Sequence, residues 1–107
     1  DEYVQTLERL VAQTRPRLQG LVLMTPYVLE PNRADAMRSQ MDAYGDALRV
    51  IARAHDAVLV DTQAALEAVM AEIHPTGLAW DRIHPTTVGH MALARAFLNA
   101  IGYDWAA

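Results

Sequence analysis

The chain has 107 residues with a formal net charge of −4, and 52% of its residues are hydrophobic. That length accommodates one domain of ordinary size, and the composition excludes a disordered tail. The sequence has no Cys, which excludes a disulfide scaffold, a cysteine nucleophile and a thiolate metal site. The acidic balance and the scattered arginines argue against nucleic acid as a partner.

The hydropathy pattern also predicts no membrane partner. The longest apolar run has about four residues, whereas a helix needs roughly 20 to cross a bilayer. Asp1 and Glu2 stand where the basic and apolar stretches of a signal peptide would begin. A cytoplasmic location is therefore favoured, and a leader upstream of Asp1 stays an open alternative.

The first predicted elements are a helix over 3–14 and a short strand over 20–25. The helix carries an apolar stripe and ends before Pro16; the stripe consists of Val4, Leu7, Leu10 and Val11. The strand is an unbroken apolar run between Gly20 and Pro26, so we expect both of its faces to be covered. A loop rich in helix breakers follows over 26–32.

A long helix is predicted over 34–55, followed by a strand over 57–61. One continuous face of this helix carries Met37, Met41, Tyr44, Leu48, Ile51 and His55. We interpret this face as packed on a sheet rather than as a binding groove, and His55 as a residue favoured by the helix dipole at its C-terminus.

A helix over 63–72 comes next, capped by Asp61 or Thr62, with an inward face of Leu66, Val69, Met70 and Ile73. A loop over 74–85 leads to a last helix, which starts at Thr86 or Thr87 and ends at Gly102. The apolar stripe of this helix consists of Val88, Met91, Ala94, Phe97, Leu98 and Ile101.

The order of these elements predicts an α/β fold with parallel strands joined by a right-handed crossover. Two strands offer too little sheet for about four helices, and two exposed parallel edges are unstable alone. We therefore expect the chain to form part of a larger doubly wound domain.

Asp81 and His84 are the best candidates for chemistry. An Asp three residues before a His can accept the imidazole Nδ1–H and leave Nε2 free as a base. Pro85 restricts the backbone of His84 to the extended region. A surface loop with an incidental ion pair is the alternative at this point.

A metal site is a second chemical interpretation. Its possible ligands would be His74, Asp81, His84 and His90, but no helical i, i+4 zinc pattern is present. We therefore predict no metal. Serine chemistry has one candidate, Ser39, which lies in the long helix without the strand-to-helix elbow of a nucleophile.

The segment 80–90, WDRIHPTTVGH, closely resembles the final block of the SGNH, or GDSL-type, serine hydrolases: Asp-x-x-His-Pro followed by a helix with Gly-His. The segments 21–27 and 58–65 and the long helix agree with the same family. Together they look most like its carbohydrate O-acetyl esterases, such as acetylxylan esterases, over essentially the whole chain.

This resemblance implies a flavodoxin-like three-layer α/β/α fold and a Ser-His-Asp triad, with His84 as the general base and Asp81 as its acid partner. The Gly-Asp-Ser segment and the oxyanion-hole blocks of the family are missing from this sequence. Residues 1–107 would accordingly be the C-terminal portion of one hydrolase domain, inactive alone, with the nucleophile in an absent N-terminal portion.

The expected function is hydrolysis of carboxylic esters, with an acetylated sugar as substrate and no cofactor. Trp80 and Tyr27 are the candidate substrate contacts, and Arg82 is interpreted as a solvated side chain. The alternative function is a catalytically incomplete fragment that pairs through its open sheet edge with its missing half or with a second copy.

Overall fold

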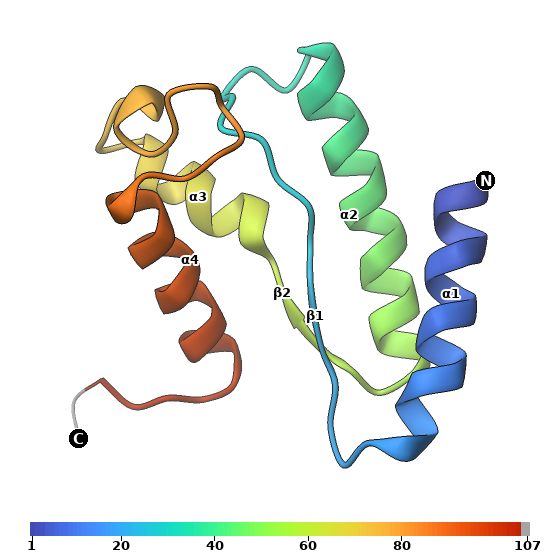
Figure 1. The fold of residues 1–107 in the computed structure, drawn as a ribbon. Coiled ribbons are helices and arrows are strands. Elements are labelled where there is room, and N and C mark those ends of the chain that lie inside the picture. Colours follow the sequence, from blue (N-terminus) through green and yellow to red (C-terminus); the bar gives the residue numbers. More distant parts are fainter. Residues whose placement is uncertain (106–107) are drawn as a thin grey trace.

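The computed structural model describes residues 1–105 as four helices, two strands and two short 3₁₀ turns (Figure 1). In chain order these are α1 (Glu2–Thr14), η1 (Arg15–Arg17), β1 (Val22–Met24), α2 (Ala36–Ala54), β2 (Val58–Val60), α3 (Thr62–Met70), η2 (Pro75–Gly77) and α4 (Thr87–Ala100). The predicted element order is confirmed. Every helix boundary lies within about two residues of its expected place, which is the usual uncertainty of helix ends.

The two strands are parallel, and α2 forms the crossover between them. The register pairs Val22 with Val58 and Met24 with Val60. This arrangement confirms the predicted α/β class with parallel strands. Both strands have three residues, so the sheet serves mainly to place the loops that leave its carboxyl ends.

Side-chain oxygens cap all four helices. Asp1, Asp35, Asp61 and Thr86 each accept a backbone N–H from the first turn of the helix that follows. Such caps satisfy amide groups that the helix itself leaves unpaired. The prediction that Asp61 caps its helix is confirmed.

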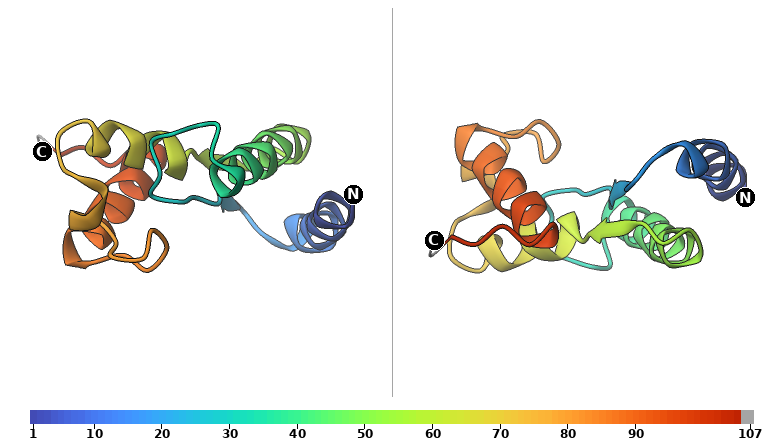
Figure 2. Two further views of the ribbon diagram at one scale, coloured as in Figure 1. Left: turned by 90° about the horizontal axis from the view of Figure 1, so that it is seen from above. Right: turned by 90° about the horizontal axis from the view of Figure 1, so that it is seen from below.

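The molecule is flat, with extents of 41 × 40 × 17 Å (Figure 2). Its radius of gyration is 14.6 Å, larger than the value of about 13 Å typical of a domain of this length. The buried cluster of Leu29, Leu66, Leu78 and Ala79 lies where the loops after β1 and η2 meet α3 and α4. The main core therefore lies beside the loop that carries Asp81 and His84.

Several large side chains of the predicted apolar stripes are exposed, and the inward orientation predicted for Met37 and Ile73 is wrong. The exposed stripe residues are Leu10 on α1, Met37 on α2, Ile73 after α3, and Val88, Met91 and Ile101 on and after α4. A layer 17 Å thick gives each helix little surface to pack against, so a full apolar stripe cannot be covered within it. Leu48 and Ile51, nearer the middle of α2, are buried as expected.

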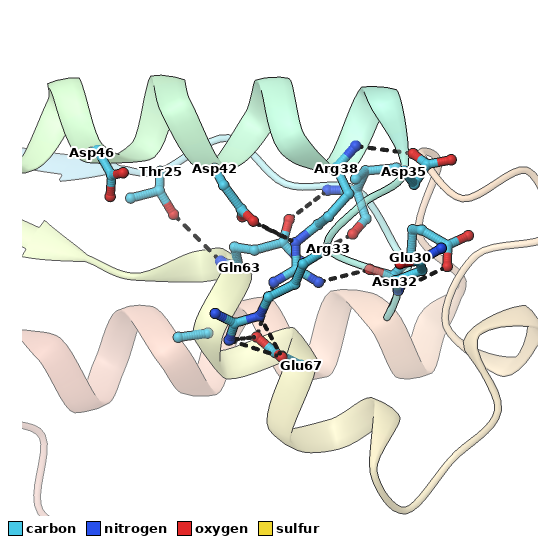
Figure 3. A network of polar contacts seen from close by, with 12 residues as sticks. Thr25, Glu30, Asn32, Arg33, Asp35, Arg38, Asp42, Asp46, Gln63 and Glu67 are labelled. Atoms are coloured by element: carbon cyan, nitrogen blue, oxygen red, sulfur yellow. Dashed lines mark hydrogen bonds and ion pairs between the residues drawn. The ribbon is translucent and has the colours of Figure 1, made fainter.

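A buried arginine, Arg38, joins α2 to α3. We call Arg38 and its three partners, Glu30, Asp42 and Glu67, the Arg38 junction. The guanidinium of Arg38 donates to Asp42 at 3.0 Å, to Glu67 at 2.9 Å and to the carbonyl of Glu30 at 2.7 Å (Figure 3). Its side chain is 2% exposed. Arg33 reaches Glu67 from the solvent side. Charge pairing is thus what allows an arginine to be buried here.

Within residues 1–105, no helix combines the length and the apolar character that crossing a bilayer requires.

Candidate active site

Asp81 and His84 lie on the loop between η2 and α4, whose two ends are fastened together. Ala79 and Pro85 form an antiparallel bridge. The Thr86 N–H donates to the Leu78 carbonyl at 2.8 Å, and the Thr86 hydroxyl donates to the Gly77 carbonyl at 2.8 Å. Residues 80–84 therefore form the end of a loop whose two ends are held together, and we call this segment the tip.

The tip is folded around the carboxylate of Asp81. Its Oδ1 accepts the backbone N–H of Ile83 at 3.0 Å and that of His84 at 2.8 Å. Its Oδ2 contacts Nδ1 of the His84 ring. The predicted pairing of Asp81 with the imidazole is therefore present in the structure, together with two backbone contacts that the sequence did not predict.

These contacts determine the protonation of the pair. The hydrogen bond from the His84 ring, helped by the backbone N–H groups of His84 and Ile83, holds the pKa of Asp81 well below its ordinary value. An ionised carboxylate only accepts hydrogen bonds, so Nδ1 of His84 carries the proton that it shares with Asp81. Nε2 is then the nitrogen left for proton transfer.

The pair faces solvent across a shallow hollow. The side chains of His84 and Asp81 are 84% and 52% exposed. The hollow, of about 460 Å³, is lined by Trp80, Asp81, His84, Pro85, Thr86 and Thr87. Trp80 is 87% exposed, which is unusual for an indole. An imidazole and an indole thus share one open site.

A larger hollow, of about 570 Å³, runs along α1 and is lined mainly by Tyr3, Leu7, Leu10 and Tyr44. Its walls contain neither a histidine nor a serine. Size alone would favour this hollow, but the chemistry favours the smaller one beside His84.

Tyr27, on the loop after β1, contacts the backbone of the loop that carries His84. Its hydroxyl donates to the carbonyl of Ile83 at 3.0 Å. Burial, and next the charge of Asp81, raise the pKa of the Tyr27 phenol. Tyr27 is absent from the walls of the hollow, so in this structure its hydroxyl supports the loop.

Arg82 is not the solvated side chain that the sequence suggested. Its Nη2 donates to Asp35 at 2.9 Å and lies 3.5 Å from Glu30. Its own carbonyl accepts the Leu29 N–H at 2.8 Å. The expectation failed because both carboxylates are far away in the sequence, where no local pattern could show them.

Gly89 is a second residue whose structural role becomes visible only in the folded chain. A Cβ at this position would lie 2.3 Å from the carbonyl oxygen of Leu78 and 2.9 Å from the Cβ of Pro85. Only glycine lets α4 approach the base of the loop this closely. The sequence signal was its place four residues after Pro85, at the start of a helix.

The other candidate ligands and the candidate nucleophile lie outside the hollow beside His84. His55 caps the C-terminus of α2, as expected, and Ser39 is exposed on the same helix. His74 caps η2, with its Nδ1 2.8 Å from the Thr76 hydroxyl. Among residues 1–105 no three His, Asp or Glu side chains are placed to hold a metal ion.

Three comparisons place this chain among known proteins. Residues 1–97 match the GDSL-like Lipase/Acylhydrolase family. The chain is 50% identical over 105 residues to an acetylxylan esterase from Geobacillus stearothermophilus, covering 98% of this chain and 48% of that protein. The crystal structure of an acetylxylan esterase from the same organism superposes with a TM-score of 0.95, at 50% identity and over the same shares of the two chains.

An α/β hydrolase from the metagenome of Lake Arreo, Spain, is equally similar. It superposes with a TM-score of 0.93 at 52% identity, covering 95% of this chain and 47% of that one. The chain thus spans about half the length of the relatives it matches. These matches confirm the resemblance that the segment 80–90 indicated, and the chain belongs to the GDSL-like lipase/acylhydrolase family.

Proposed function

We propose that this chain supplies the general base, His84, and its acid partner, Asp81, to the active site of a serine esterase. The observation that carries the proposal is the contact between Asp81 and Nδ1 of His84 on an exposed loop. Asp81 holds one ring nitrogen and leaves the rest of the imidazole open to solvent. A base has to reach its substrate.

The pair would act in two steps. Nε2 of His84 takes the proton of a serine hydroxyl as its oxygen attacks the ester carbonyl, and returns that proton to the leaving alcohol. It next takes a proton from the water whose oxygen attacks the acyl-enzyme carbonyl, and returns that proton to the serine oxygen as the acyl–serine bond breaks and the acid leaves. Asp81 stabilises the imidazolium formed in each step and holds the ring in one tautomer. No cofactor is needed.

The substrate we propose is an acetylated carbohydrate. The curated relative and the solved structure from Geobacillus stearothermophilus both carry the name acetylxylan esterase, and Trp80 presents an exposed indole beside His84. Aromatic faces pack well against the apolar faces of sugar rings. Trp80 would contact the sugar, whereas Tyr27 would act through the Ile83 carbonyl that it holds.

We further propose that residues 1–107 are the C-terminal portion of one hydrolase domain. The chain covers 48% of its curated relative, and β1 pairs only with β2 among the described residues. A base without a nucleophile and oxyanion donors lacks the interactions that contribute most to such catalysis. The 107 residues alone would therefore be inactive.

The test uses the full-length protein that carries this chain, with acetylated xylooligosaccharide and p-nitrophenyl acetate as substrates. His84→Ala should lower kcat by about 10⁶-fold, as loss of a triad histidine does elsewhere. Asp81→Asn should lower kcat by up to about 10⁴-fold, because an amide favours the wrong tautomer and Asp81 is the side chain that contacts Nδ1 of His84 in this structure. A His84→Ala enzyme with near-normal kcat would exclude the proposal.

A structural or interaction role is the second candidate, favoured by the open edge of β1 and by the exposed side chains of Met24 and Val58 on the strands. Experiments on the isolated chain distinguish the catalytic role from the interaction role. Esterase activity, or labelling of Ser39 by a fluorophosphonate probe, would contradict the predicted inactivity. A folded monomer in size-exclusion chromatography would weaken the interaction role.

A further inference from the structure

We propose that Arg82 is the positioning residue of the Asp81–His84 pair, and that it acts by fastening the backbone between them to the loop after β1. The inference rests on the proposed function, because it gives Arg82 a role in the chemistry of that pair. Arg82 directly follows Asp81 and comes two residues before His84. Its torsion angles therefore help to decide where the imidazole lies relative to the carboxylate.

The backbone of Arg82 is in an unfavourable conformation. Its φ is 74°, and the one other non-glycine residue with positive φ in the described chain is Asp56. The left-handed region is unfavourable for a side chain such as arginine. A residue stays there only when its surroundings enforce it. In this turn the N–H groups of Ile83 and His84 both point at Asp81.

Contacts from one segment of the chain, residues 29–35, enforce this conformation. The Arg82 carbonyl accepts the Leu29 N–H at 2.8 Å. The Arg82 guanidinium donates to Asp35 at 2.9 Å and lies 3.5 Å from Glu30. The side chain of Arg82 is 39% exposed, and the side chains of Asp35 and Glu30 are 28% and 26% exposed. Partial burial screens such pairs less than open solvent would.

The anchoring segment is itself fixed. Asp35 caps α2 through the Arg38 N–H at 3.0 Å. The carbonyl of Glu30 accepts from the buried Arg38 guanidinium at 2.7 Å. The backbone N–H of Arg38, and to a smaller degree Arg82, lower the pKa of Asp35, so Asp35 is charged at neutral pH. The conformation of the tip is thereby tied to α2 and to the Arg38 junction.

A purely structural role for Arg82 makes a different prediction. Removing the side chain would then lower stability and leave the Asp81–His84 contact intact in the molecules that remain folded. A positioning role requires the contact itself to loosen. The proton between His84 Nδ1 and Asp81 reports this directly, because a hydrogen bond to a carboxylate shifts the NMR resonance of that proton downfield.

The experiment compares Arg82→Ala, Arg82→Gly and Arg53→Ala in the full-length protein. Arg53 is an exposed arginine on α2 and serves as the matched control. Arg82→Ala keeps an unfavourable φ and loses the ion pairs, and we expect kcat to fall about 10- to 100-fold with little change in KM. Glycine adopts positive φ without strain, so Arg82→Gly should lose less, about 3- to 10-fold.

The downfield resonance, assigned by its loss in Asp81→Asn, should weaken or shift in Arg82→Ala and stay unchanged in Arg53→Ala. Unchanged kcat and an unchanged resonance in Arg82→Ala would overturn the proposal. So would activity losses in both Arg82 variants that merely follow the unfolded fraction. If His84→Ala abolishes activity while Arg82→Ala does not affect it, the positioning role fails and the proposed function stands.

Discussion

The Arg38 junction and the Asp81–His84 loop use the same kinds of group in opposite environments. In the junction, the guanidinium of Arg38, whose side chain is 2% exposed, is surrounded by acceptors. In the loop, the imidazole of His84, whose side chain is 84% exposed, has a single carboxylate partner. The buried charge of Arg38 must keep its partners, so the Arg38 junction serves the stability of the fold. Exposure leaves the imidazole of His84 free for the contact with a substrate that we propose.

Arg38→Ala is expected to have the largest effect on stability. It leaves the carboxylates of Asp42 and Glu67, each 34% exposed, without their main cation. The free energy of unfolding should fall by about 3 kcal/mol, the lower end for a broken buried pair because Arg33 still reaches Glu67. Urea denaturation of the full-length protein followed by circular dichroism measures this change.

Arg33→Ala is the matched control, because it removes another arginine from the same Glu67. The Arg33 side chain is 71% exposed, so its loss should cost less than about 1 kcal/mol. Equal losses in the two variants would show that burial does not separate these ion pairs.

Gly89→Ala tests the Asp81–His84 loop. Its expected effect on stability is smaller than that of Arg38→Ala. The new methyl group would meet the Leu78 carbonyl and Pro85, at the base of the loop. We expect a loss of about 1 to 3 kcal/mol of stability, as for other overpacked sites, together with a fall in kcat. Gly20→Ala is the control, since a Cβ there meets nothing within 4 Å. Similar effects of the two substitutions would contradict this account.

The smallest predicted effect is a dependence of stability on pH through Asp81. Its pKa in the folded chain lies below the ordinary value of 3.8. The unfolded state therefore binds the proton more readily. The stabilisation is complete above about pH 4 and is lost as the pH falls toward the folded-state pKa.

Asp81→Asn should accordingly flatten the fall of the unfolding midpoint in urea at pH values below about 4. The measurement compares the two proteins at a series of pH values and constant ionic strength. An equally steep decline in both would show that Asp81 does not contribute to the acid sensitivity of the fold.

The sequence by itself determined the element order, the parallel crossover and the pair Asp81 and His84. Each of these depends on local information. Apolar periodicity separates helix from strand, and a carboxylate three residues before a histidine in a loop can reach its ring within one turn of chain. The caps at Asp61 and at Thr86 are local in the same way.

Only the tertiary structure decided which side chains are covered and what holds the loop. Met37 and Met91 follow helical stripes yet remain exposed, because periodicity describes one face and cannot show whether a neighbour covers it. Arg82 finds Asp35 across 47 residues of sequence. Contacts at that separation depend on how α2 and the loops after β1 and η2 meet, so no local pattern could contain them.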